Sequence, residues 1–485
     1  MGYYFISIGG SGSKIMESLA HLCVAGILPG NEKMNIIAVD PDSGNGNFER
    51  AATIINEFSE FQNLDVGNDT PLFKNKIEIV RPFPWKPSTQ NIKLDDLMNA
   101  NIIKHTPLGK LYRALYTSKE RNTSLNEGFR GHPSIGAAVL AQKFLFQRDQ
   151  GWGHLIQEIQ NDVGNSDRGV KIFLAGSIFG GTGAAGLPTI SRLLREKLKD
   201  YSKKISIGGA FLLPYFTFIS EEENNELFAK AKNFLTNAKA ALKYYSLGKN
   251  DFDYMYFFGD SLLTDVNFSI GGNEQKNDSH IIEFYAALAA ADFFDQEPCH
   301  DSQGTSFKYI CRNREHAYDW EDFQRAVPNL KEKFVQFARF IFAYNQLVDP
   351  IIKDPPQQGF FEKLFSNKTP PWYVDLIKRP NVNVDTNEVK NFERYTLNFC
   401  NWLKQIETPR NGRQISLIKS SFFNVSQGKV HLVADEFKSC DFSQSNLTLA
   451  KVSNKLNSPS PNLKKLSTKN FGRLLRFLYE ACRAS

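Results

Sequence analysis

Short apolar runs alternate with amphipathic segments over the first 325 residues, and this alternation restricts the fold more than any other feature. The runs typical of buried strands are YYFISI (3–8), NIIAV (35–39), KIFLA (171–175), ISIGGAFLL (205–213) and FDYMYFF (252–258). Helical spacing follows two of them, at Ile15, Leu19 and Leu22 and at Leu187, Ile190, Leu194 and Leu198. Strands that alternate with helices predict an α/β fold with a parallel, doubly wound sheet.

The chain of 485 residues is too long for one ordinary domain. Beyond residue 325 the alternation ends, and helical patterns stand at 328–353, 387–407 and 471–484 between proline-rich breaks. We therefore predict a domain at residues 1–325 and a mostly helical region at residues 326–485 that contacts partners.

The composition excludes several classes of protein. The net charge of +6 is interleaved along the chain rather than gathered in blocks, so we expect no nucleic-acid partner. No apolar run is long enough to span a bilayer, and the N-terminus lacks the basic region of a signal peptide. The 6 cysteines are scattered, which is typical of reduced thiols. These features predict a cytoplasmic protein.

Two glycine-rich turns join a strand to a helix. Glycine lets the main chain approach a phosphate closely, and the amides at a helix N-terminus attract its charge. Two such turns in one domain predict a nucleotide with several phosphates, although the first turn alone is also explained by a tight entry into a helix. The predicted contacts are Gly9, Gly10, Ser11, Gly12 and Ser13 in the first turn, and Gly180, Gly181, Thr182 and Gly183 in the second.

Two further loops carry polar or glycine residues at predicted strand ends or helix starts. Asp40 and Asp42, in AVDPD, are predicted to hold Mg²⁺ or ribose hydroxyls, with an Asp-Pro turn as the alternative. Gly131, in GFRGHPSIG, precedes a helical pattern and is predicted to contact the nucleotide, with a surface turn as the alternative. A Walker lysine motif is absent, and Ile15 stands where a dinucleotide fingerprint needs its third glycine.

In order and spacing, these motifs resemble the tubulin/FtsZ superfamily. The matching stretches are GGSGS after the first strand, AVDPD after the second, GFRGHPSIG with Gly131, Pro133 and Gly136, AGSIFGGTGAAG, and FLLPYFTFISEE. The signature glycine run is altered, because Phe179 replaces its first glycine and Ala185 its last. The stretch GGNEQKNDSHIIEFYAALAAADFF resembles a divergent bacterial branch, which implies work beside a membrane-associated partner.

The resemblance implies that residues 1–325 are a tubulin/FtsZ-like Rossmann-type GTPase domain that binds GTP or GDP with Mg²⁺. Lys14 stands where the family reads guanine through an amide side chain, and it is expected to contact the base or a phosphate. Asn277 and Glu283 are candidates for contacts with the base, and Asp40 and Asp42 are candidates for the metal.

The resemblance also implies head-to-tail self-assembly into an open filament, with hydrolysis completed by acidic residues that reach the next subunit's nucleotide. The stretch AYDWEDFQ offers Asp319 and Asp322 for this catalytic role, and a helix N-cap is the alternative.

Two other functions remain open: a nucleotide-binding scaffold or switch without hydrolysis, and an NAD-dependent Rossmann enzyme. A zinc site is a minor alternative for one cluster, which consists of Cys299, His300, Cys311 and His316.

Overall fold

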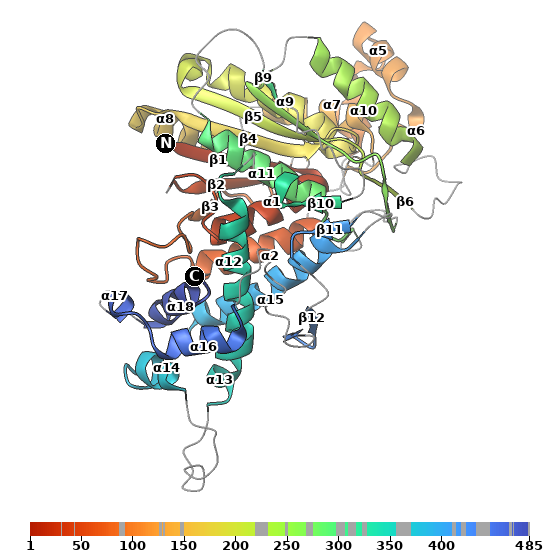
Figure 1. The fold of residues 1–485 in the computed structure, drawn as a ribbon. Helices are drawn as coiled ribbons and strands as arrows, with labels where there is room; N and C mark the ends of the chain where they lie inside the picture. Colours follow the sequence, from red (N-terminus) through yellow and green to blue (C-terminus); the bar gives the residue numbers. More distant parts are fainter. Residues whose placement is uncertain are drawn as a thin grey trace. The chain divides into compact units, whose positions relative to one another are not determined.

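The computed structural model of the chain forms two compact units, each built from separate stretches of sequence (Figure 1). Unit 1 consists of Met1–Leu19, Glu32–Ala52 and Glu78–Cys311, and unit 2 of Ala20–Asn31, Thr53–Ile77 and Arg312–Ser485. The described residues are 1–30, 32–42, 44–86, 93–125, 129, 131–145, 150–218, 231–247, 251–267, 275–296, 306–308, 317–322, 327–355, 370–409, 414–418, 423–432, 447–464, 468 and 470–483.

A 7-stranded sheet forms the centre of unit 1, with the strand order β3-β2-β1-β4-β5-β7-β9 over the described residues. Its strands are β1 (Gly2–Ile8), β2 (Met34–Val39), β3 (Ile77–Ile79), β4 (Val170–Ser177), β5 (Ile205–Leu212), β7 (Tyr254–Phe258) and β9 (Ser306–Lys308). The pairs β1·β2, β1·β4, β4·β5, β5·β7 and β7·β9 are parallel, which confirms the predicted α/β fold.

Both faces of this sheet are covered, which explains why its central strands are mainly apolar. Residues Tyr4, Ile6 and Ile8 of β1 belong to a buried cluster with apolar residues of three helices, α7 (Pro133–Leu145), α8 (Gln150–Asn165) and α9 (Gly181–Lys197). On the other face, Tyr3 stacks on Phe294 of α11 (Ile281–Asp295) with ring centroids 4.6 Å apart, and Phe173 contacts Phe293 of the same helix. The helices of unit 1 outside the long β3–β4 connection are α1 (Gly9–Val24), α2 (Gly46–Phe61), α9 (Gly181–Lys197), α10 (Ala231–Ser246) and α11 (Ile281–Asp295), with α1 and α2 continuing into unit 2.

The connection from β3 to β4 is long and carries several helices, of which the sequence pattern predicted only the one after Gly131. They are α3 (Leu94–Leu97), α4 (Ala100–Ile103), α5 (Pro107–Leu115), α6 (Ser118–Arg121), α7 (Pro133–Leu145) and α8 (Gln150–Asn165). The Thr106 hydroxyl caps α5 by accepting from the Gly109 amide at 3.1 Å. A 3₁₀ turn, η1 (Lys199–Lys204), precedes β5, and a small parallel pair forms between β6 (Phe216–Phe218) and β8 (Thr264–Val266).

Unit 2 is mostly helical in its described C-terminal part, as predicted. Its helices are α12 (Leu330–Ala343), η4 (Tyr344–Val348), α13 (Asp349–Lys353), α14 (Pro371–Tyr373), η5 (Val374–Lys378), α15 (Asn387–Glu407), α16 (Leu449–Asn457), α17 (Pro461–Lys464) and α18 (Asn470–Ala481). Short strand pairs join β10 (Ala317–Asp319) to β11 (Gln414–Ser416) and β12 (Phe423–Ser426) to β13 (Lys429–Leu432), with η3 (Trp320–Asp322) after β10. Aromatic rings build the core, and Phe61 packs on Phe392 and Tyr395.

Within the described ranges, no helix has the combination of length and apolar character that a bilayer span requires. Cys23, Cys400 and Cys482 are buried free thiols. The cluster of Cys299, His300, Cys311 and His316 lies outside the described residues. In the part of the chain that the structure does describe, no group of three or more His, Cys, Asp or Glu side chains is arranged to hold a metal.

Candidate functional site

The two glycine turns meet at one edge of the sheet in unit 1. Helix α1 begins at Gly9 directly after β1, and α9 begins at Gly181 with Gly180 as its N-cap, shortly after the neighbouring parallel strand β4. Gly9 has a φ of +71°, and a Cβ atom built on it would lie 3.1 Å from Cβ of Thr182. The two helix N-termini are therefore in direct contact, and the contact depends on the missing side chain of Gly9.

The other predicted loops reach the same place. A Cβ atom on Gly181 would lie 3.0 Å from the Gly131 nitrogen, and one on Gly10 would lie 2.9 Å from Nδ2 of Asn45. The structure thus brings together the turns after β1, β2 and β4 and the segment before α7, as the order of the motifs predicted. These four segments are called the convergent turns below.

Some of the predicted residues also have a packing role. A Cβ atom on Gly12 would lie 2.6 Å from the Ala175 oxygen, and one on Gly183 would lie 2.4 Å from the Ser177 oxygen. These two glycines let α1 and α9 lie tightly against β4. The Ser13 hydroxyl donates to the Gly9 oxygen at 3.2 Å within α1, so it is turned into its own helix.

The chemistry of the convergent turns fits an anion. The first turns of α1 and α9 contain no acidic residue, and the leading amides of a helix have no partner within the helix. Gly10, Ser11, Gly180 and Thr182 are partly exposed, whereas the residues around them are buried. Main-chain amides and two hydroxyl side chains at adjoining helix N-termini form a donor set suited to a chain of phosphates.

The loop after β2 uses its carboxylates internally. The Asp40 carboxyl accepts from the Asp42 amide at 3.0 Å and from Asn45 Nδ2 at 3.3 Å, and Asp42 accepts from the Gly44 amide at 3.0 Å. Burial raises the pKa of Asp40 to about 7, with the charge of Asp42 acting in the same direction and the hydrogen bonds opposing it. The Asp-Pro turn explains these contacts, and a metal ion would have to draw on oxygens that already accept hydrogen bonds.

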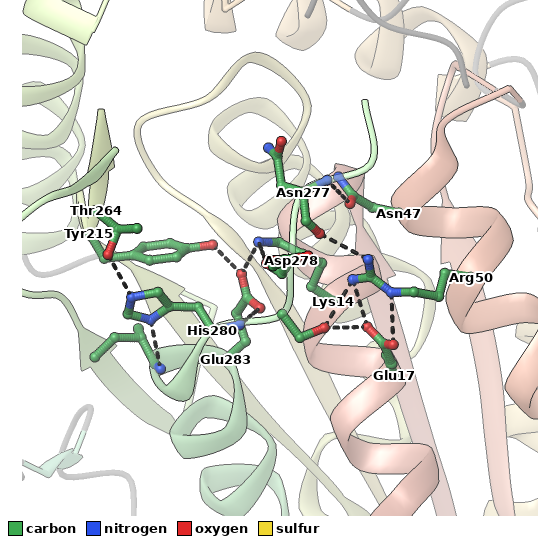
Figure 2. Close-up of polar contacts among 12 residues, drawn as sticks. Lys14, Glu17, Asn47, Arg50, Tyr215, Thr264, Asn277, Asp278, His280 and Glu283 are labelled. Atoms are coloured by element: carbon green, nitrogen blue, oxygen red, sulfur yellow. Dashed lines mark hydrogen bonds and ion pairs between the residues drawn. The ribbon is translucent and has the colours of Figure 1, made fainter. Parts of the chain in front are cut away.

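Lys14 is buried and paired. Its Nζ lies 2.5 Å from Oε1 of Glu283 and donates to the Asp278 oxygen at 3.2 Å (Figure 2). Glu283 has 0% exposure and also accepts from the Tyr215 hydroxyl at 2.5 Å and from the His280 amide at 2.7 Å. Local sequence gave no hint of this partner, because Glu283 lies on α11, far from Lys14 along the chain.

Asn277 is held through its main chain. Its amide donates to Oδ1 of Asn47 at 3.0 Å and its carbonyl accepts from Arg50 at 2.9 Å, while Figure 2 shows its side chain directed away from both. Arg50 in turn binds both carboxylate oxygens of Glu17, at 2.8 and 2.9 Å. Sequence reasoning missed Glu17 and Arg50, although a charged residue inside the otherwise apolar face of a helix indicates a buried pair.

Phe179 lies beside the second turn, and its ring packs into an aromatic cluster. The ring centroids of Phe234, Phe216 and Tyr215 lie 4.8, 5.5 and 6.3 Å from its own. The Phe179 oxygen accepts from Asn237 at 3.1 Å. The altered glycine run therefore anchors α10 and the segment after β5 beside the turn.

Asp319 and Asp322 belong to unit 2. Asp319 ends β10, Asp322 ends η3, and the Asp322 carboxylate accepts from the Asp319 amide at 3.1 Å. This contact is that of a local cap. Their proposed role in hydrolysis stays a prediction.

Residues 119–266, which include β4, the second glycine turn and β5–β7, match a family described as tubulin like. No curated protein matches the chain in sequence.

Similar solved structures include CetZ2 from Haloferax volcanii, a GTPγS-bound protofilament, with 12% identity, a TM-score of 0.28, and coverage of 61% of this chain and 58% of that chain. Another is CetZ from Methanosaeta thermophila, with 15% identity, a TM-score of 0.25, and coverage of 53% and 46%. The chain thus spans less than two thirds of either. The family match thus assigns residues 119–266 to a tubulin-like family.

Proposed function

We propose that this protein binds GTP or GDP with Mg²⁺ at the convergent turns, assembles head-to-tail and hydrolyses GTP between subunits. The observation that carries the proposal is the contact between the Gly9 and Thr182 positions, which joins two helix N-termini into one anion-binding edge. The match of residues 119–266 to a tubulin-like family makes a guanine nucleotide the first choice.

The phosphates would lie against the amides of Gly9–Gly12 and Gly180–Gly183, with the hydroxyls of Ser11 and Thr182 as further donors. The side-chain amide of Asn277, on a segment fixed through its main chain, is the proposed contact for the base. When bound, Mg²⁺ offsets phosphate charge, and Asp40 or Asp42 would hold it or its waters.

Hydrolysis would require a second subunit. Asp319 and Asp322 are the proposed groups that orient and polarise the attacking water at the neighbouring subunit's nucleotide. A head-to-tail contact of this kind is heterologous and gives an open filament. The segment around α11 resembles a divergent bacterial branch of the superfamily. This resemblance implies a membrane-associated partner, which is also part of the proposal.

A second candidate is a nucleotide-binding scaffold or switch that does not hydrolyse. It is favoured by the Asp322 carboxylate, which already accepts a hydrogen bond from the Asp319 amide. An NAD-dependent enzyme is disfavoured by Ile15 in place of the third glycine of the fingerprint.

The deciding experiment is to denature freshly purified protein, identify the released nucleotide by chromatography, and then follow phosphate release from GTP across a protein dilution series. We expect guanine nucleotide and a turnover per subunit that rises steeply with protein concentration. Bound guanine nucleotide without turnover would support the scaffold, and a turnover independent of concentration would refute hydrolysis between subunits. A bound dinucleotide, or no nucleotide at all, would refute the proposal.

A further inference from the structure

Six residues before α11, Gln275–His280, are bound to the N-terminal parts of α1 and α2 in unit 1 (Figure 2). On the α2 side, the Asn47 amide donates to the Gln275 oxygen at 3.1 Å, and Arg50 donates to the Asn277 oxygen at 2.9 Å. On the α1 side, Lys14 donates to the Asp278 oxygen, and the Ser279 hydroxyl donates to Glu17 at 2.7 Å. We call this segment the strap.

The two cations that donate to carbonyl oxygens of the strap, Lys14 and Arg50, each belong to an ion pair. Lys14 of α1 pairs with Glu283 of α11, and Arg50 of α2 pairs with Glu17 of α1. Both carboxylates are buried, with 0% and 1% exposure. If Lys14 turned toward a phosphate, it would leave the Glu283 carboxylate buried without its cation, which is strongly unfavourable.

The strap also reaches the first glycine turn through asparagines. Asn47 donates to and accepts from the strap, and Asn45 and Asn47 lie 2.9 and 3.5 Å from the position of a Cβ on Gly10. The Asn47 amide also donates to Oδ1 of Asn45 at 3.0 Å. A change in the strap therefore moves groups that contact the turn.

We propose, on the basis of the proposed nucleotide site, that the strap holds the first glycine turn in its ligand-binding conformation and that Lys14 is its positioning residue, not a phosphate ligand. Because strap and turn share these bonds, ordering one orders the other. By the reciprocity of coupled equilibria, loosening the strap weakens nucleotide binding, and bound nucleotide stiffens the strap.

The test compares Lys14→Met and Glu283→Gln with the wild-type protein in titrations with fluorescent guanosine mono-, di- and triphosphate. Since Lys14 does not touch phosphate, Lys14→Met should weaken all three by a similar factor, on the order of tenfold. Glu283→Gln should also weaken all three, because it breaks the same pair. If Lys14 were a phosphate ligand, the loss of affinity in Lys14→Met would grow with each added phosphate. Glu283→Gln would then release Lys14 and tighten binding. Either result would overturn the proposal.

Lys171→Met is the matched control, because Lys171 is a second buried lysine that binds α11 at its opposite end. It donates to the Phe294 oxygen at 2.8 Å and to the Gln296 oxygen. We expect Lys171→Met to lower the thermal midpoint and leave nucleotide affinity unchanged. An equal loss of affinity in this control would mean that general loosening of α11, and not the strap, weakens binding.

Hydrogen exchange supplies a readout that a purely structural role of Lys14 would not change. GDP should protect the amides of residues 275–283 in the wild-type protein, and saturating GDP should protect them less in Lys14→Met. Equal protection would overturn the coupling. Titration of the wild-type protein comes first: absence of binding there would refute the proposed function, whereas normal wild-type binding with unaffected variants would refute the strap alone.

Discussion

Substitution of Gly9 by alanine tests whether the contact between the two helix N-termini governs nucleotide binding. Gly9 has a φ of +71°, and an L-residue in this region costs about 1–2 kcal/mol. The new Cβ would also lie 3.1 Å from Cβ of Thr182, closer than ordinary van der Waals contact, so the turns must move apart. If that movement costs a further ~1.4 kcal/mol in the bound state, affinity falls about tenfold.

Gly428→Ala is the control for this experiment. Gly428 has a φ of +67° in the β12–β13 turn, and a Cβ atom there would meet nothing within 4 Å. Both variants should lose about 1–2 kcal/mol in urea unfolding, but only Gly9→Ala should weaken fluorescent GDP in an equilibrium titration. Unchanged affinity in Gly9→Ala, or equal weakening in Gly428→Ala, would refute the reasoning.

Three further predictions follow from individual side chains. Because burial raises the pKa of Asp40 from 3.8 to about 7, its contribution to stability is fully present below about pH 4 and is lost as the pH rises through 7. Urea unfolding in EDTA should therefore show a decrease in the free energy of unfolding of up to about 4 kcal/mol over this range, and Asp40→Asn should remove that decrease. An identical pH profile in the variant would contradict the raised pKa of Asp40. Asp319→Ala or Asp322→Ala should keep bound nucleotide and reduce phosphate release on the order of 100-fold, and full activity in both would dismiss these residues as catalytic. Phe179→Ala should lower the free energy of unfolding by about 3–5 kcal/mol, because the ring fills an aromatic cluster, and a loss below 1 kcal/mol would show that the cluster repacks freely.

The sequence predicted well those features that depend on local pattern. Apolar runs marked β1, β2, β4, β5 and β7, and glycines at strand ends marked the turns that meet beside Gly9 and Gly181. Parallel neighbours place their carboxyl ends at one edge, so the convergence of the turns follows from strand order. The short helices α3–α6 were not predicted, because each is too brief to develop a helical period.

Features that depend on tertiary partners could not be predicted. The sequence marks Lys14 as a cation beside a phosphate-binding turn, but its pairing with Glu283 exists only once α11 packs against α1. In the same way, the sequence does not show that Asp40 is buried and accepts hydrogen bonds from Asp42 and Asn45.

The division of α1 and α2 between the two units has a practical consequence for fragment studies. Residues 20–31 and 53–77 supply part of the core of unit 2, where Phe61 and Phe73 pack on Phe392. A C-terminal fragment that begins at residue 326 leaves these rings behind, so no single cut yields two intact pieces. Loss of activity on truncation will therefore report a broken core, and dissection of this protein requires point substitutions.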